Sequence, residues 1–143
     1  AQEKTGVNAL MEYAWALHES AYGTSAIAMQ KYNIFGVGAV DSAPMTEANP
    51  FNSVQECVEY HSKTWVSVGY SDPITDNRYY GASLGNKITG YNVKYATDTY
   101  WAEGIAGTMY RIDKYLGFKD LDYYSIGIIN NEIIQHHEWI VIA

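Results

Sequence analysis

The chain has 143 residues, of which 48% are hydrophobic and 15% aromatic, enough for one globular domain with a sizeable core. Its net charge is −7 and it has no basic run, which argues against a nucleic-acid partner, because phosphate binding requires clustered Lys and Arg. The one cysteine excludes an internal disulfide, and no stretch reaches the ~20 apolar residues that span a membrane.

The first predicted helix starts near Val7, because apolar residues recur with helical spacing at Leu10, Met11, Ala14 and Leu17. Residues 1–5 before it are polar, and we expect them to be frayed. Glu19 falls well off the apolar stripe, close to Glu12 and Trp15. The pattern alone therefore assigns Glu19 to the solvated surface.

A second helix is predicted over residues 26–31. Gly23 can adopt the left-handed conformation that ends the first helix, and Thr24 or Ser25 can cap the second. Asn33 then offers a turn before an extended segment, 34–38. Residues 40–52 are polar and rich in turn formers, and we interpret them as a small β-hairpin lobe.

A third helix is predicted to begin at Ser53, which forms a capping box with Glu56. Gly69 should end it. Its buried face is predicted to consist of Val54, Cys57, Val58, His61, Trp65 and Val68. Cys57 on this face is interpreted as a buried structural thiol.

Residues 70–92 are predicted to form a long loop of the kind that lines a site. Thr97 or Asp98 should cap a last helix, which Gly117 ends. Its apolar stripe is Trp101, Ile105, Met109, Ile112 and Leu116. These features place one domain at 1–117.

The remaining residues, 118–143, differ in character. Asn130-Asn131 could turn a hairpin between 124–129 and 132–142, both rich in β-branched and aromatic residues. The segment is interpreted as a β-rich extension of the domain or the start of a following module.

Two segments resemble the signatures of one family. The stretch ALHES-x-YGTS-x-IA-x-x-x-YN-I-FGVGA at 16–39, and Tyr95-Ala-Thr-Asp98 followed by Trp101, resemble the bacterial glucosaminidase domain, glycoside hydrolase family 73. The resemblance covers about 7–117. It implies an α+β, mainly α, lysozyme-like fold with a small β-hairpin lobe across a substrate groove. It also implies an endo-β-N-acetylglucosaminidase that cleaves peptidoglycan, with Glu19 as the catalytic acid.

Glycoside hydrolysis requires a proton donor and a group that attacks or stabilises the developing oxocarbenium ion. Apolar walls favour the protonated form of a carboxyl group, and Trp15, Tyr22 and Phe35 are near enough in sequence to Glu19 to supply them. For the second group, Asp41 and Glu47 in the predicted lobe are the candidates. The N-acetyl oxygen of the substrate is a third route.

The remaining candidate site residues follow from the same motifs. The resemblance gives Tyr95 a place in the groove near the cleaved bond. Substrate-binding candidates are Tyr22, Asn33, Phe35, Tyr91 and Tyr100. Trp101 could stack a sugar, but its place on the apolar stripe favours a structural role.

No metal or cofactor is predicted. His136-His137-Glu138 are adjacent residues whose side chains point apart in a strand, and the chain has neither H-E-x-x-H nor paired cysteines.

Peptidoglycan glycan strands are the expected partner, and the domain is expected to be monomeric, secreted or wall-located, or phage-encoded, with any wall-binding modules outside this chain. The alternatives are a lytic transglycosylase or muramidase on the same fold, and a non-catalytic glycan-binding module.

Overall fold

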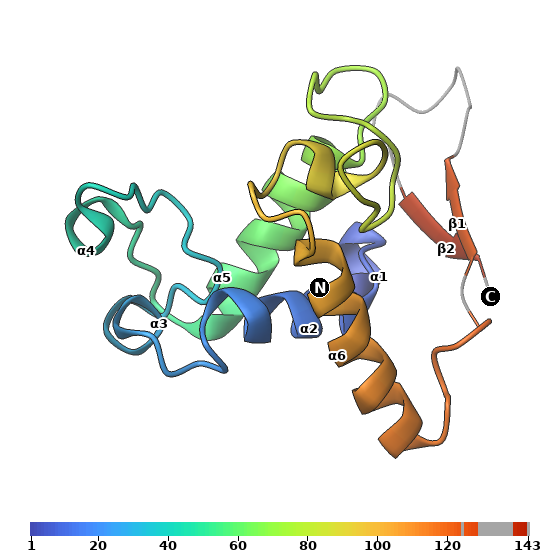
Figure 1. Cartoon of the computed structure of the whole chain (residues 1–143), viewed down its shortest axis with the longest axis horizontal. Helices are drawn as coiled ribbons and strands as arrows, with labels where there is room; N and C mark the ends of the chain where they lie inside the picture. Colours follow the sequence, from blue (N-terminus) through green and yellow to red (C-terminus); the bar gives the residue numbers. More distant parts are fainter. Residues whose placement is uncertain (124, 129–138, 143) are drawn as a thin grey trace.

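The computed structural model describes residues 1–123, 125–128 and 139–142 (Figure 1). This part of the chain is mainly helical, with one pair of short strands near its end. In chain order the elements are α1 (Gln2–Thr5), α2 (Ala9–Glu19), α3 (Ala26–Lys31), α4 (Pro44–Glu47), α5 (Val54–Tyr60), the π-helix η1 (His61–Tyr70), the 3-10 helix η2 (Tyr91–Val93), α6 (Trp101–Leu116), β1 (Ser125–Ile128) and β2 (Trp139–Ile142).

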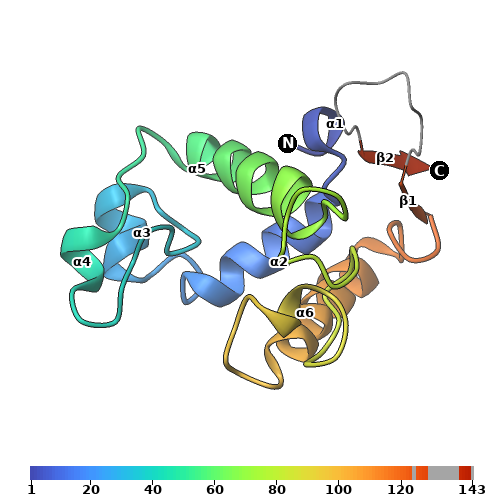
Figure 2. The ribbon, with the colours of Figure 1, turned by 90° about the horizontal axis from the view of Figure 1, so that it is seen from above.

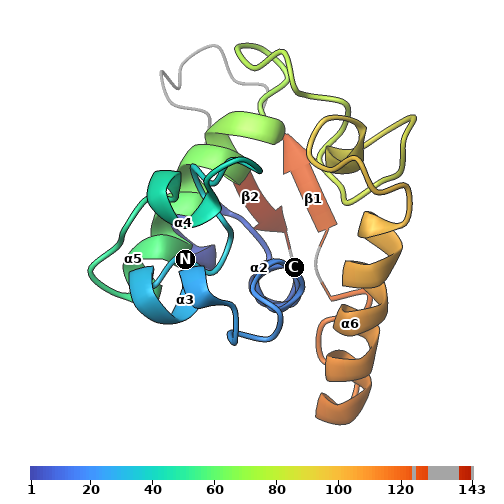
Figure 3. The same cartoon turned by 60° about the vertical axis from the view of Figure 1, so that its left-hand side comes forward.

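Helix α2 lies between α5 on one side and α6 on the other (Figure 2, Figure 3). The core forms around Trp15 of α2, whose side chain is fully buried. Its other members come from α5, η1, η2, α6 and two connecting segments, and they include Phe35, Cys57, Val66, Tyr91, Trp101 and Ile105. Helix α2 therefore lies at the centre of the core, with Trp15 packed between the other elements.

The amphipathic pattern predicted α2 correctly in position, but it missed one buried residue. Asn8 caps the helix by accepting a hydrogen bond from the Met11 N–H (2.8 Å). Glu12, expected beside Glu19 on the polar side, is only 3% exposed. The expectation of a frayed start was also wrong, because α1 forms within residues 1–5.

The helix that starts at Ser53 is confirmed, with an unexpected continuation. The Ser53 hydroxyl accepts from the Glu56 N–H (3.1 Å), and the Glu56 carboxylate accepts from the Asn52 N–H (2.7 Å). From residue 61 onward the helix widens into η1. The i→i+5 turns change which side chains face inward. Val66 is therefore buried, whereas Val68, predicted to be buried, is 47% exposed.

The predicted β-hairpin lobe does not form. Residues 40–52, all of which the structure describes, contain turns and the short helix α4 but no strand. Pro44 occupies the first turn of α4, where its missing N–H costs nothing, and Glu47 lies in the same turn. Helices α3 and α4 lie side by side at one end of the molecule (Figure 1, Figure 2). We call residues 26–47, which comprise α3, α4 and the segment between them, the α3–α4 arm.

The long loop between η1 and η2 is confirmed, and it is held by local contacts. Arg78 donates from Nε to Asp76 (2.8 Å) and stacks over the Tyr70 ring at 4.5 Å. The hydrogen bond from Arg78 holds the pKa of the Asp76 carboxyl below its usual value. Gly85 and Gly90 are packed so closely that a Cβ on either would overlap the other's backbone.

Helix α6 ends as predicted, but it begins at Trp101, later than a cap at Thr97 or Asp98 implies. Neither Thr97 nor Asp98 is the N-cap; Tyr100 is, and Asp98 accepts from the Tyr100 N–H (2.9 Å) in the turn before it. Gly117 ends the helix with φ 85°. Leu116 at the end of the predicted stripe is 51% exposed, because the helix extends beyond the core.

The C-terminal hairpin is partly described. β1 and β2 pair antiparallel, with Ser125 opposite Ile142. The predicted turn at Asn130-Asn131 lies outside the described residues. The segment before β1 is tied to the helical part, because Asp120 accepts from the Asn8 side chain (3.0 Å) and donates its N–H to Asp113 (2.9 Å). In the described part of the chain, no helix combines the length and apolar character needed to cross a bilayer.

Candidate active site

Glu19 lies where the end of α2 meets the start of α6. It is the last residue of α2, and its side chain is half-buried. The indole Nε1–H of Trp101, the first residue of α6, donates a hydrogen bond to Glu19 Oε1 at 2.9 Å. Trp101 is 2% exposed. The carboxyl group is thus fixed between two packed helices rather than solvated as the pattern alone suggested.

The chain turns sharply directly after Glu19. Ala21, Tyr22 and Gly23 all have positive φ, at 51°, 59° and 79°. The left-handed conformation costs a non-glycine residue roughly 1–2 kcal/mol. The Ser20 hydroxyl accepts from the Gly23 N–H (2.8 Å) and offsets part of this cost. Strain of this kind is concentrated at functional sites, where the surrounding structure maintains it.

Three aromatic rings pack together beside Glu19. Trp15 meets Tyr95 edge-on at 4.7 Å and Trp101 edge-on at 4.8 Å, while Tyr95 and Trp101 lie 4.8 Å apart at a tilt of 33°. Burial and then the nearby Glu19 charge raise the pKa of the Tyr95 hydroxyl well above its ordinary value. The structure therefore brings Glu19, Tyr95 and Trp101 together, with the Tyr95 hydroxyl protonated.

Three of the predicted substrate-binding residues are buried. Asn33 is 1% exposed, and its amide bonds to Val37 O and Asn49 O (both 2.9 Å), which closes the loop after α3. Phe35 stacks flat on a buried histidine, and Tyr91 shares a hydrogen bond with Ser71 (2.8 Å). Asn33, Phe35 and Tyr91 thus take part in packing and hydrogen bonding inside the fold, and their contact with substrate stays a prediction.

The other candidates are accessible. Tyr22 and Tyr100 are 68% and 72% exposed; Tyr22 follows Glu19 by three residues, and Tyr100 directly precedes Trp101. Asp41 and Glu47 are exposed on the α3–α4 arm. Substrate contact by Tyr22 or Tyr100, and a catalytic role for Asp41 or Glu47, stay predictions.

A buried polar cluster between α2 and η1 was not predicted. Glu12 Oε1 accepts from Ser62 Oγ and pairs with His61 Nδ1, both at 2.8 Å. The His61 ring lies 3.7 Å from Phe35 and 4.9 Å from Trp15. The cluster links α2 to η1 and to the loop after α3. Because Glu12 and His61 are 49 residues apart, helical spacing gives no signal for this pair.

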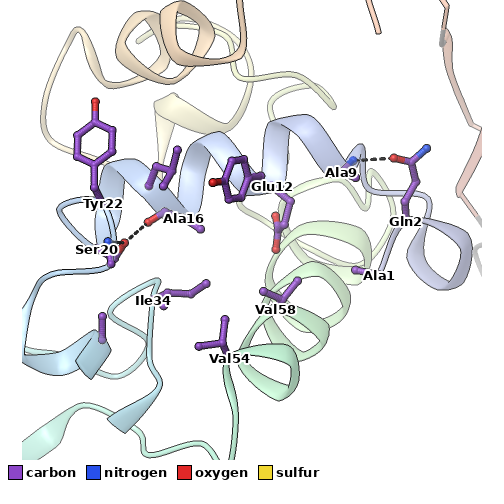
Figure 4. A pocket seen from close by; sticks show the side chains of 14 residues that line it. Ala1, Gln2, Ala9, Glu12, Ala16, Ser20, Tyr22, Ile34, Val54 and Val58 are labelled. Carbon is purple, nitrogen blue, oxygen red and sulfur yellow. Dashed lines mark hydrogen bonds between the residues drawn. The ribbon is translucent and has the colours of Figure 1, made fainter. Parts of the chain in front are cut away.

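A pocket of about 460 Å³ lies between α2 and α5 (Figure 4). Ile34, Val54 and Val58 point toward α2 across it, and Glu12 lies at its α2 wall. Ser20 and Tyr22 line its edge, so the pocket reaches the turn that follows Glu19. Glu19 itself is not among its lining residues. Its size is in the range of ligand-binding cavities, roughly 300–1,000 Å³.

Among the described residues, no group of three or more His, Cys, Asp or Glu side chains is arranged to hold a metal ion. His136-His137-Glu138, weighed as zinc ligands, lie outside those residues. Cys57 is fully buried, as predicted, and burial raises the pKa of its thiol, which does not suit a nucleophile.

Comparison with known proteins agrees with the sequence resemblance. The glucosaminidase family model, described as mannosyl-glycoprotein endo-beta-N-acetylglucosaminidase, matches residues 1–114. Two relatives from Streptococcus pneumoniae, in strains TIGR4 and R6, are 40% identical over 120 residues and bear the name "Putative endo-beta-N-acetylglucosaminidase". The match covers 84% of this chain but only 17% and 16% of those relatives. The chain belongs to the glucosaminidase family of glycoside hydrolases.

Proposed function

We propose that this chain is the catalytic domain of an endo-β-N-acetylglucosaminidase that hydrolyses the bond after N-acetylglucosamine in peptidoglycan, with Glu19 as general acid. The observation that supports this most is the placement of Glu19: a half-buried carboxyl at a helix end, hydrogen-bonded on one oxygen by Trp101. Among the described residues, none donates a hydrogen bond to the other oxygen, Oε2. Family membership supports the reaction class. We also infer a lysozyme-like arrangement, with the α3–α4 arm in the place of a β-hairpin lobe.

The proposed step begins with proton transfer from Glu19 to the glycosidic oxygen as the bond to the sugar C1 breaks. The bonding electrons leave with that oxygen, and the sugar develops oxocarbenium character. The exposed ring of Tyr100 can stack against a sugar ring. The protonated Tyr95 hydroxyl can donate a hydrogen bond beside the reacting centre.

The second catalytic group is proposed to come from the α3–α4 arm or from the substrate. Asp41 and Glu47 are exposed carboxylates that could activate a water molecule if the arm faces the bound glycan. Alternatively, the N-acetyl oxygen of the substrate attacks C1, and no second carboxylate is needed. Loss of activity in Asp41→Asn or Glu47→Gln distinguishes these routes.

The bond after N-acetylglucosamine occurs in two classes of glycan. The family description names mannosyl-glycoproteins, whereas the resemblance in the motifs points to bacterial peptidoglycan. Both substrates should therefore be offered to the purified chain. Cleavage of peptidoglycan, with no release of glycan from a high-mannose glycoprotein, would support the proposal, and the reverse result would overturn its substrate class.

The role of Glu19 is tested by Glu19→Gln, which keeps the shape of the side chain but cannot donate a carboxyl proton. We expect wall hydrolysis to fall by about 100- to 10,000-fold with an unchanged melting temperature, since general acid catalysis contributes roughly 10²–10⁴-fold. Glu3→Gln is the matched control, because Glu3 is exposed on α1. Retained activity in Glu19→Gln would contradict the assignment, and inactivity of the wild type with intact glycan binding would favour the non-catalytic alternative.

A further inference from the structure

The Trp101 indole is a fixed hydrogen-bond donor to Glu19. Its Nε1–H lies 2.9 Å from Glu19 Oε1, and the ring is 2% exposed. An indole N–H can donate but cannot accept. Oε1 must therefore be an acceptor in this arrangement, whether Glu19 is protonated or ionised.

The ring cannot easily turn away from Glu19. Trp101 packs edge-on against Trp15 at 4.8 Å, and it packs against Tyr95 at 4.8 Å with a tilt of 33°. Trp15 precedes Glu19 by four residues, so the two lie on the same side of α2, one turn apart. Helix α2 therefore carries both the Glu19 carboxyl group and the Trp15 ring, which packs against the hydrogen-bond donor Trp101.

We propose that Trp101 is the positioning residue of the general acid: it occupies Oε1 and leaves Oε2 as the oxygen that carries the transferred proton. This inference rests on the proposed role of Glu19. When the Oε2 proton moves to the glycosidic oxygen and the C1–O bond breaks, Glu19 becomes a carboxylate. The Trp101 hydrogen bond then has a charged acceptor and strengthens. An interaction that is stronger in the transition state than in the ground state raises kcat.

The test is Trp101→Phe, which keeps an aromatic ring and removes the donor. A hydrogen bond is worth about 1.5–3 kcal/mol to a charged acceptor and about 0.5–1.5 kcal/mol to a neutral one, so the variant loses the difference, about 1–1.5 kcal/mol, between ground state and transition state. We therefore expect kcat on soluble glycan strands to fall about 5- to 12-fold, with KM changed less than about twofold. Site-specific benzothienylalanine at position 101, which has the indole shape with sulfur in place of N–H, should give the same loss without a change in packing volume.

Trp65→Phe is the matched control. Trp65 is a partly buried ring of the same core and has no contact with Glu19 among the described residues. Trp65→Phe should lower the melting temperature and leave kcat unchanged, because phenylalanine keeps an aromatic ring against Tyr95, which Trp65 meets edge-on at 6.4 Å.

The outcomes separate the positioning role of Trp101 from the general-acid role of Glu19. If Glu19→Gln is inactive and either folded Trp101 variant keeps kcat within about twofold of the wild type, the positioning role is overturned. A raised KM with unchanged kcat overturns it as well, because that result describes a sugar-stacking ring. If Glu19→Gln stays active, the proposed general acid itself fails, and the inference fails with it.

Discussion

Alkaline pH should destabilise the fold through Tyr91. Its side chain is 3% exposed and stacks on Trp15 with ring centroids 5.8 Å apart. Burial raises the pKa of the Tyr91 hydroxyl to about 12 from an ordinary value of 10.0, and its hydrogen bond with Ser71 acts in the opposite direction. The folded protein therefore keeps a proton that the unfolded chain releases near pH 10.

The sign and size of the effect follow from this difference. The contribution of Tyr91 to stability is complete below about pH 10 and is lost as the pH rises toward about 12. Two pKa units correspond to about 2–3 kcal/mol of unfolding free energy. Tyr95 also lowers the stability of the fold at alkaline pH, because burial raises the pKa of its hydroxyl as well.

The assay is urea unfolding, followed by tryptophan fluorescence, at a series of pH values from neutral to about 12. Tyr91→Phe should be less stable at neutral pH by about 1 kcal/mol, because Ser71 loses its partner, but its stability should fall less steeply above pH 10. Tyr115→Phe is the control, since Tyr115 is 89% exposed, and its pH dependence should match the wild type. An equally steep fall in Tyr91→Phe and in the wild type would refute the reasoning.

The other predictions concern the capping box and the site. Ser53→Ala should lower the unfolding free energy by about 1 kcal/mol without changing the cleavage product, and no loss of stability would mean that the cap is dispensable. Tyr95→Phe should lower kcat while the melting temperature stays nearly fixed, whereas Tyr95→Ala should also cost about 3–5 kcal/mol of stability; full activity in Tyr95→Phe would remove its hydroxyl from the mechanism. Of Asp41→Asn and Glu47→Gln, one should lose more than about tenfold in kcat if the arm supplies the base, and a loss in neither would favour attack by the substrate's N-acetyl group.

Local signals in the sequence were sufficient for much of the helical framework. The bounds of α3 match the predicted 26–31, because Ser25 accepts from the Ala28 N–H as an N-cap and Lys31 precedes a turn. Ser53 and Gly117 act as predicted for the same reason: a cap and a left-handed residue depend on a few neighbouring residues.

Tertiary contacts explain what the pattern missed. Glu12 looked solvated because its partners, His61 and Ser62, lie about fifty residues away. The widened turns of η1 replaced Val68 by Val66 in the core, which a 3.6-residue period cannot anticipate. The wrong prediction of a hairpin in the α3–α4 arm has a local cause instead. Pro44 followed by Glu47 is a helix-start signal, which the hairpin interpretation overlooked.

The candidate site was predicted in part. The motif singled out Glu19 and Tyr95 as candidates, and the structure places both beside Trp101. The stripe on α6 correctly predicted that Trp101 is buried, but periodicity gives no information on the direction of an indole N–H. The hydrogen bond that holds Glu19 therefore became visible only in three dimensions.

The most direct test of the proposed function is the identity of the new chain end. Purified protein is incubated with peptidoglycan, the soluble products are reduced with borohydride, and the fragments are sequenced by mass spectrometry. Hydrolysis after N-acetylglucosamine, with Glu19 as the acid, predicts reduced N-acetylglucosamine at the new ends and none in Glu19→Gln. Reduced muramic acid or anhydromuramic acid at those ends would contradict the proposed function, because these products indicate a muramidase or a lytic transglycosylase.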